Sequence, residues 1–66
     1  MKWILRVEYR KQVNGKYQYY KKDFDYNGET DKTKFKWVMD SDKIAYGNCK
    51  PNEDVMRYEL IEVEGN

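Results

Sequence analysis

The sequence lacks histidine and has only one Cys, one Ser, one Pro and one Ala among its 66 residues. Without His, the Ser–His and Cys–His pairs of nucleophilic catalysis and the His ligands of many zinc sites are excluded. The single cysteine, Cys49, excludes an intramolecular disulfide, so the chain is not a disulfide-stapled scaffold. Cys49 lies beside Lys50 in a predicted loop, where we expect an ordinary, unreactive thiol.

Long apolar runs are absent as well. The longest uncharged apolar run is Trp3-Ile4-Leu5, whereas a helix needs about 20 apolar residues to span a bilayer. The N-terminus also lacks the apolar segment of a secretion signal. We therefore expect a cytoplasmic protein with no membrane partner.

Arrangements of side chains that could carry out catalysis are equally scarce. Paired carboxylates occur at Asp40/Asp42 and Glu53/Asp54, but both pairs lie in hydrophilic stretches. Acid–base catalysis needs environments that push two pKa values apart, and solvated turn residues do not provide them. No glycine loop for phosphate is present, and no Gly-x-Ser-x-Gly elbow surrounds Ser41. The sequence therefore predicts a protein that is not an enzyme and holds no metal and no cofactor.

Aromatic residues supply most of the apolar surface that is present. Leu, Ile, Val and Phe are few, but the chain has seven Tyr and two Trp, each able to bury about 150–250 Å². The net charge is only +1, whereas disordered chains combine low hydrophobicity with high net charge. We predict a single folded domain over residues 1–66 with an aromatic core. A core this small often needs a partner or self-association for its stability.

A β-hairpin is predicted in the N-terminal half. Four apolar residues (Trp3, Leu5, Val7 and Tyr9) alternate with charged ones, which is the period of a half-buried strand. Asn14-Gly15 is a strong signal for a type I′ turn. In the second strand, residues 16–26, one face carries Tyr20, Lys22, Phe24 and Tyr26, and the other carries Tyr17, Tyr19, Lys21, Asp23 and Asp25.

The segment 30–46 admits two interpretations. As a helix, it is capped by Thr30 or Asp31, ends at Gly47-Asn48 and buries a stripe of Phe35, Val38, Met39, Asp42, Ala45 and Tyr46. As strands, Phe35, Trp37 and Met39 alternate with Lys34, Lys36 and Val38 before a turn at 40–43. The helix is favoured, and a shorter helix that ends near Met39 stays open.

A last strand is predicted over residues 55–64. Its apolar residues fall on two faces, with Met56, Tyr58 and Leu60 on one and Val55, Ile61 and Val63 on the other. The apolar face changes near Leu60-Ile61, which predicts a β-bulge at that point or a strand that is covered on both sides.

Together these elements predict an α+β fold of β-β-α-β order. A hairpin followed by a crossover helix places the last strand beside the first, which gives an antiparallel sheet of order 2-1-3 with the helix on one face. Residues 1–22 carry a net charge of +6 and residues 23–66 a net charge of −5. The basic second strand and the acidic last strand therefore become opposite edges of the sheet.

The hairpin interleaves aromatic and basic residues between Lys16 and Lys22. Single-stranded nucleic acid is bound by such surfaces, through stacking on rings and contacts from cations to phosphates. Exposed Tyr on an uncovered sheet face equally marks a protein interface. Trp37, off the main helical stripe, is either a second-face core residue or an exposed anchor. The candidate partner-binding residues are Tyr17, Tyr19, Lys21, Arg6, Arg10 and Trp37.

The layout resembles a known class of proteins. It combines a Gly-Lys-Tyr-rich hairpin over 14–20, an aromatic-centred helix over 35–39 and a closing strand over 55–63. In this organisation the chain is similar to small phage-encoded inhibitors of host enzymes, in particular the dimeric phage inhibitors of uracil-DNA glycosylase. The resemblance implies a homodimer that occludes a host enzyme by direct contact.

We therefore predict a non-enzymatic protein-binding module, encoded by a phage or mobile element, whose partner is a host enzyme. The alternatives are a single-stranded nucleic-acid-binding domain that uses the Tyr/Lys hairpin and a structural accessory subunit.

Overall fold

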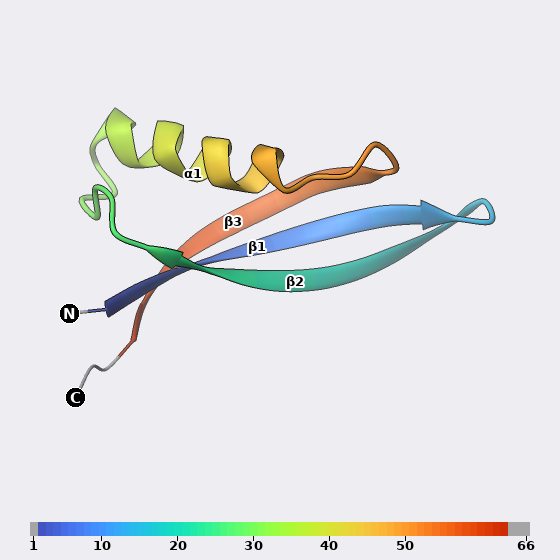
Figure 1. Cartoon of the computed structure of the whole chain (residues 1–66), viewed down its shortest axis with the longest axis horizontal. Helices are drawn as coiled ribbons and strands as arrows, with labels where there is room; N and C mark the ends of the chain where they lie inside the picture. The colour runs from blue at the N-terminus through green and yellow to red at the C-terminus, as the bar shows by residue number, and fades with distance from the viewer. Residues whose placement is uncertain (1, 64–66) are drawn as a thin grey trace.

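The computed structural model describes residues 2–63 as three antiparallel strands and one helix (Figure 1). The elements are β1 (Lys2–Val13), β2 (Lys16–Tyr26), α1 (Phe35–Gly47) and β3 (Glu53–Val63). The strand order is β2-β1-β3, and α1 lies over one face of the sheet (Figure 1). The predicted α+β class, the β-β-α-β order and the strand order are confirmed.

The hairpin of β1 and β2 follows from its turn and its alternation. Asn14 and Gly15 both have positive φ, 53° and 78°, as a type I′ turn requires. The register pairs Val13 with Lys16 and Trp3 with Tyr26. Because neighbouring residues of a strand point to opposite faces, this register confirms the two predicted faces of β2.

A β-bulge interrupts the pairing of β1 with β3, but not where the sequence predicted it. Glu8 pairs with Arg57 and Tyr9 pairs with Val55, so Met56 is an extra residue between two regular stretches. The bulge turns Val55 to the same side as Tyr9, which is the side of the helix. The prediction that Val55 shares a face with Ile61 and Val63 is therefore wrong, and so is the grouping of Met56 with Tyr58 and Leu60.

The predicted site of the bulge pairs regularly instead. Leu60 lies opposite Leu5 and Ile61 lies opposite Ile4. Leu60 is buried under the helix, and Ile61 is half-buried on the other face. The change of apolar face at this point reflects apolar residues on both faces of a regular strand.

The helix begins later than the sequence predicted. Thr30 and Asp31 lie in the preceding loop, where the Asp31 carboxylate accepts hydrogen bonds from the Thr33 N–H (3.0 Å) and the Thr33 hydroxyl (2.6 Å). Asp31 thus stabilises a turn and does not cap the helix, and the residue before α1 is Lys34, which makes no side-chain cap. The helix continues to Gly47, so the two-strand interpretation and the short helix are both wrong.

The helix also turns a different face to the sheet than the predicted stripe. Ser41 and Ala45 are its buried residues, and Trp37 and Ile44 pack partly buried against the core. The predicted core residues Phe35, Met39 and Tyr46 are 74%, 56% and 58% exposed. Of the predicted stripe only Ala45 is buried, with Val38 half-buried.

The Tyr9 side chain accounts for part of this orientation. Its hydroxyl donates a hydrogen bond to the Ala45 carbonyl at 2.7 Å, so the Tyr9 ring lies between β1 and the side of α1 that carries Ala45. Tyr9 in turn stacks on Tyr20, with ring centroids 5.3 Å apart. The core is aromatic in part, as predicted, and consists of Leu5, Val7, Tyr9, Tyr26, Ala45 and Leu60.

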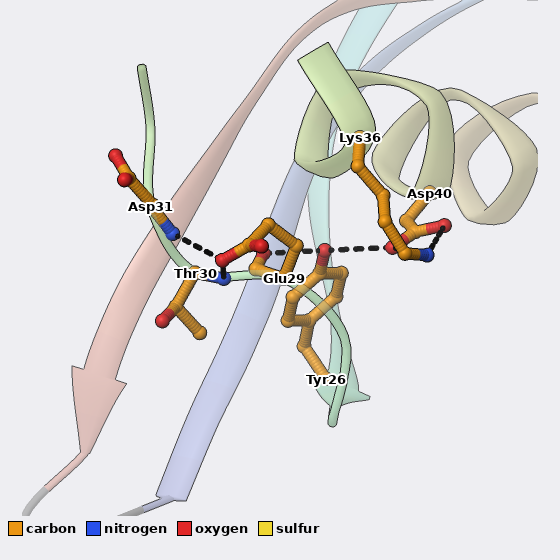
Figure 2. A network of polar contacts seen from close by, with 6 residues as sticks. All are labelled: Tyr26, Glu29, Thr30, Asp31, Lys36 and Asp40. Atoms are coloured by element: carbon orange, nitrogen blue, oxygen red, sulfur yellow. Dashed lines mark hydrogen bonds and ion pairs between the residues drawn. The ribbon is translucent and has the colours of Figure 1, made fainter. Parts of the chain in front are cut away.

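Polar contacts tie the loop before α1 to the end of β2 (Figure 2). The Tyr26 hydroxyl donates to the Glu29 carbonyl at 2.8 Å and lies 3.4 Å from the Asp40 carboxylate. Lys36 pairs with Asp40 one helical turn away, at 3.2 Å. A Cβ at Gly28 would lie 2.8 Å from both the Tyr26 hydroxyl and the Asp40 carboxylate, so a larger residue here would force these two side chains to shift.

Candidate protein-contact surface

The face of the sheet opposite α1, here called the open face, brings together five of the six predicted partner-binding residues. Arg6 and Arg10 project from β1, and the residues paired with this side of β1 on β2 are Tyr17, Tyr19, Lys21, Asp23 and Asp25. Trp37 lies on the other side of the sheet. The alternation of the hairpin therefore predicted correctly that the five strand residues share one surface. Trp37, on the helix, does not belong to that surface and packs against the core.

At the turn end of the open face, Arg10, Tyr17 and Tyr19 form what we call the tyrosine cluster. The Arg10 guanidinium lies 4.2 Å from the centre of the Tyr17 ring and donates two hydrogen bonds to one Asp54 carboxylate oxygen, at 2.8 and 3.0 Å. Tyr17 and Tyr19 are 50% and 61% exposed. Arg10 is thus held on two sides, and it fixes the Tyr17 ring beside an exposed Tyr19.

The charges along the rest of the open face largely neutralise one another. Arg6 makes a two-pronged ion pair with Asp23, at 2.8 and 2.9 Å, and this hydrogen-bonded pair lowers the pKa of Asp23 and raises that of Arg6. Arg57 lies between Glu8 and Glu59, at 4.0 and 3.4 Å. Of the basic residues predicted for this patch, Arg6 and Arg10 are held in ion pairs, and Lys21 belongs to none of the ion pairs within residues 2–63.

Trp37 lies in the packing between α1 and β3. Its ring meets that of Tyr58 edge-on, with centroids 5.7 Å apart, and its indole N–H donates to the Lys32 carbonyl at 2.9 Å. Trp37 is half-buried and contacts the core. Of its two predicted roles, this position corresponds to the core residue.

Sequence reasoning missed a second exposed surface, the helix stripe, which consists of Phe35, Met39 and Tyr46 on the outer side of α1. These are three of the large apolar residues that the described chain leaves exposed. A shallow hollow of about 410 Å³ lies along the stripe beside Met39 and Tyr46. The signal that could have revealed it is the pair Ser41 and Ala45, because small residues one turn apart mark the side of a helix that can approach a sheet closely.

The chain matches no protein-family model, and no curated protein and no solved structure matches it. Among residues 2–63, no group of three or more Cys, Asp or Glu residues is arranged to hold a metal ion. In the same range, no helix has the length and apolar character needed to cross a membrane.

Proposed function

We propose that this protein is a non-enzymatic protein-binding module whose main contact surface is the tyrosine cluster. The observation that carries the proposal is the exposure of Tyr17 and Tyr19 beside an Arg10 that is already fixed in place. Tyr and Arg are the residue types that most often carry interface energy. Rings have few rotatable bonds, so their burial against a partner costs little conformational entropy.

The charge pattern around the cluster supports a protein partner over nucleic acid. Arg6 and Arg10 are bound to Asp23 and Asp54, so on this face they are not free to neutralise phosphates, on which the affinity of nucleic-acid binders largely depends. A partner protein can cover these ion pairs without leaving a charge unpaired, which is the main penalty for burial of a charged group.

The mode of action we propose is occlusion of a host enzyme by direct contact, in line with the resemblance to small phage inhibitors. Occlusion needs only a rigid surface that fits the target, and the tyrosine cluster, with Arg10 fixed by Asp54, is the surface that we propose for it. The helix stripe lies on the opposite side of the molecule from the tyrosine cluster, and we assign it to the proposed homodimer. Its spacing, residues 35, 39 and 46, is typical of helices that pack together along one side.

The test begins with capture of partners from a host lysate on the immobilised chain, followed by measurement of the affinity of the isolated partner. We expect Tyr17→Ala and Tyr19→Ala each to weaken binding by about 30-fold, the effect of a hot spot of about 2 kcal/mol. Gln18→Ala, in the same strand, is the matched control and should change the affinity less than about twofold. If both tyrosine variants bind like the unaltered chain, the tyrosine cluster is not the contact surface.

Stoichiometric addition of the chain should also abolish the activity of the captured enzyme. Full enzyme activity in the complex would refute occlusion while leaving protein binding intact. Light scattering tests the homodimer separately: Met39→Lys should convert a dimer to a monomer, and a monomeric unaltered chain at high concentration would refute this assignment of the helix stripe.

A further inference from the structure

A third surface, on the helix side of the hairpin and beyond the end of α1, is rich in lysine. It surrounds a hollow of about 380 Å³, here called the lysine hollow, which lies between the hairpin and the segment that follows the helix. Its lining comes from four segments of the chain and consists of Lys11, Tyr20, Lys21, Lys22, Asn48, Lys50 and Glu53.

The lysine hollow holds more positive charge than its own acid balances. Three of its lysines, Lys11, Lys22 and Lys50, lie on the helix side with one carboxylate, that of Glu53, whereas the side chain of Lys21 projects to the open face. The Glu53 carboxylate accepts hydrogen bonds from the Tyr20 hydroxyl (2.5 Å) and from the backbone N–H of Lys50 (3.0 Å). Within residues 2–63, the ion pairs involve Arg6, Arg10, Lys36 and Arg57 and none of these three lysines. The ammonium groups are therefore available to an anion from outside.

The floor of the hollow is fixed in one protonation state at neutral pH. The hydrogen bond from Tyr20, together with Lys50 and Lys11, lowers the pKa of Glu53, and the same hydrogen bond raises the pKa of Tyr20 to about 12. Glu53 therefore stays ionised and Tyr20 stays a donor. Glu53 keeps its negative charge, so the positive character of the hollow comes from the lysines that outnumber it.

Two of the lysines are also positioned by rings. The Lys11 ammonium lies 5.9 Å from the centre of the Tyr20 ring, and the Lys22 ammonium lies 5.5 Å from the centre of the Phe24 ring. Ammonium groups at such distances are attracted to the faces of rings. Lys11 and Lys22 are thus drawn toward the helix side of the hairpin, where Lys50 also lies.

The cations of the hollow suit an anion of multiple charge. The planar fork of Arg matches carboxylate and phosphate alike, whereas Lys binds phosphate as a compact point charge. Several ammonium groups around one hollow fit a phosphate group, which carries close to two negative charges at neutral pH. Here all the cations are lysines, and Arg6 and Arg10 are engaged on the other face of the sheet. The volume lies within the range of about 300–1,000 Å³ that is typical of small-ligand sites.

We propose that the lysine hollow is a binding site for a phosphate-bearing ligand, with the phosphoryl oxygens held by Lys11, Lys22 and Lys50. The site lies on the opposite side of the sheet from the tyrosine cluster, so it does not depend on the proposed protein contact. It adds a second, chemically different ligand to the same small domain.

The test is a titration of the full ¹⁵N-labelled chain with pyrophosphate at low salt, followed by NMR. We expect saturable shifts of the amide signals of Asn48 and Lys50. The double variant Lys22→Gln/Lys50→Gln should weaken binding by about tenfold, equivalent to about 1.4 kcal/mol. The matched control Lys2→Gln/Lys43→Gln removes the same charge from residues that do not line the hollow, and it should weaken binding less than about twofold.

Two results would overturn the proposal. One is the absence of saturable shifts at millimolar pyrophosphate, which corresponds to a binding free energy weaker than about 4 kcal/mol. The other is an equal loss of affinity in the two double variants, because general attraction of an anion to a basic chain would then explain the binding. A Tyr17→Ala/Tyr19→Ala chain should bind pyrophosphate normally, which separates this site from the proposed protein contact.

Parallel titrations identify the source of the phosphate, and both outcomes that follow support the site. Stronger binding of a short single-stranded oligonucleotide, with a steep loss of affinity as salt is added, would indicate a nucleic-acid backbone. Stronger binding of tripolyphosphate than of pyrophosphate, with no oligonucleotide binding, would indicate a free oligophosphate.

Discussion

Ser41 offers the sharpest test of how α1 packs on the sheet. Its side chain is fully buried, and its hydroxyl makes no hydrogen bond of ordinary geometry within residues 2–63. The Tyr26 hydroxyl lies near it, and this contact opposes the rise in the pKa of Tyr26 that burial causes. A buried hydroxyl without a partner costs about 1–3 kcal/mol. Ser41→Ala removes this cost with the loss of one atom, and Ala is also the better helix former by about 0.5 kcal/mol. After a small loss of packing, we expect the free energy of unfolding to rise by about 1–2 kcal/mol.

Urea and thermal denaturation, followed by circular dichroism, measure this change. For a domain of this size each kcal/mol raises the melting temperature by about 4–8 °C, and the urea m-value should stay constant because the buried area is unchanged. Ser41→Thr is the matched comparison, because it keeps the hydroxyl and adds a methyl group where the helix meets the sheet. We expect Ser41→Thr to cost about 1–3 kcal/mol.

A loss of stability in Ser41→Ala would refute this reasoning. It would mean that the hydroxyl is hydrogen-bonded in the folded protein. A Ser41→Thr chain with an unchanged free energy of unfolding would separately show that the contact between helix and sheet has space for an additional methyl group.

Two further predictions concern stability. Tyr9→Phe keeps the buried ring but removes the donor to the Ala45 carbonyl, so we expect a loss of about 1–3 kcal/mol in urea denaturation; an unchanged midpoint would contradict the role of this bond. The hydrogen bond from Tyr20 lowers the pKa of Glu53, so its stabilisation is present above about pH 4.3 and lost as the pH falls through the folded value. Burial and a hydrogen bond to Asp42 raise the pKa of Tyr58 to about 12, so its contribution is complete below about pH 10 and lost above it. Unfolding measured across pH should show a plateau between these limits, and a decline that begins near pH 7 would contradict both assignments.

The parts of the fold that local sequence determines could be predicted. Asn14-Gly15 fixes the hairpin turn, and the alternation in β1 and β2 fixes the faces of both strands. The strand order followed because a helix after a hairpin returns the chain to the free edge of β1. These features depend on residues that are close together in sequence or on the handedness of short connections.

The orientation of the helix could not be read from hydrophobicity. The apolar stripe of Phe35, Met39 and Tyr46 is the larger one, yet it is exposed, because α1 turns Ser41 and Ala45 to the sheet. This orientation includes the hydrogen bond from Tyr9 to the Ala45 carbonyl, a contact between residues far apart in the sequence that hydrophobicity does not predict. The sequence also misplaced the bulge at Met56. Because β3 has apolar residues on both faces, its alternation does not show how it pairs with β1.

The candidate surface was predicted in outline only. The alternation of residues between the two faces of each strand placed Tyr17 and Tyr19 correctly beside Arg10. The basic character of that surface was overestimated. The ion pairs of Arg6 with Asp23 and of Arg10 with Asp54 depend on the register between strands, which the alternation alone does not provide. The lysine hollow could not be foreseen at all, because its lining comes from four separate segments.

The central position of β1 has a consequence for the chain as it is synthesised. A hairpin closes within about 1–10 μs, whereas a ribosome adds about 5–20 residues per second. The residues of β1 and β2 are therefore made seconds before Leu60, which pairs with Leu5 on the other edge of β1. The outer edge of β2 has no partner strand during that time, nor in the finished sheet within residues 2–63. Lys21 and Lys22 lie midway along β2. Charged side chains on an edge strand oppose its pairing with strands of other chains, so these two lysines protect the open edge of the sheet from aggregation.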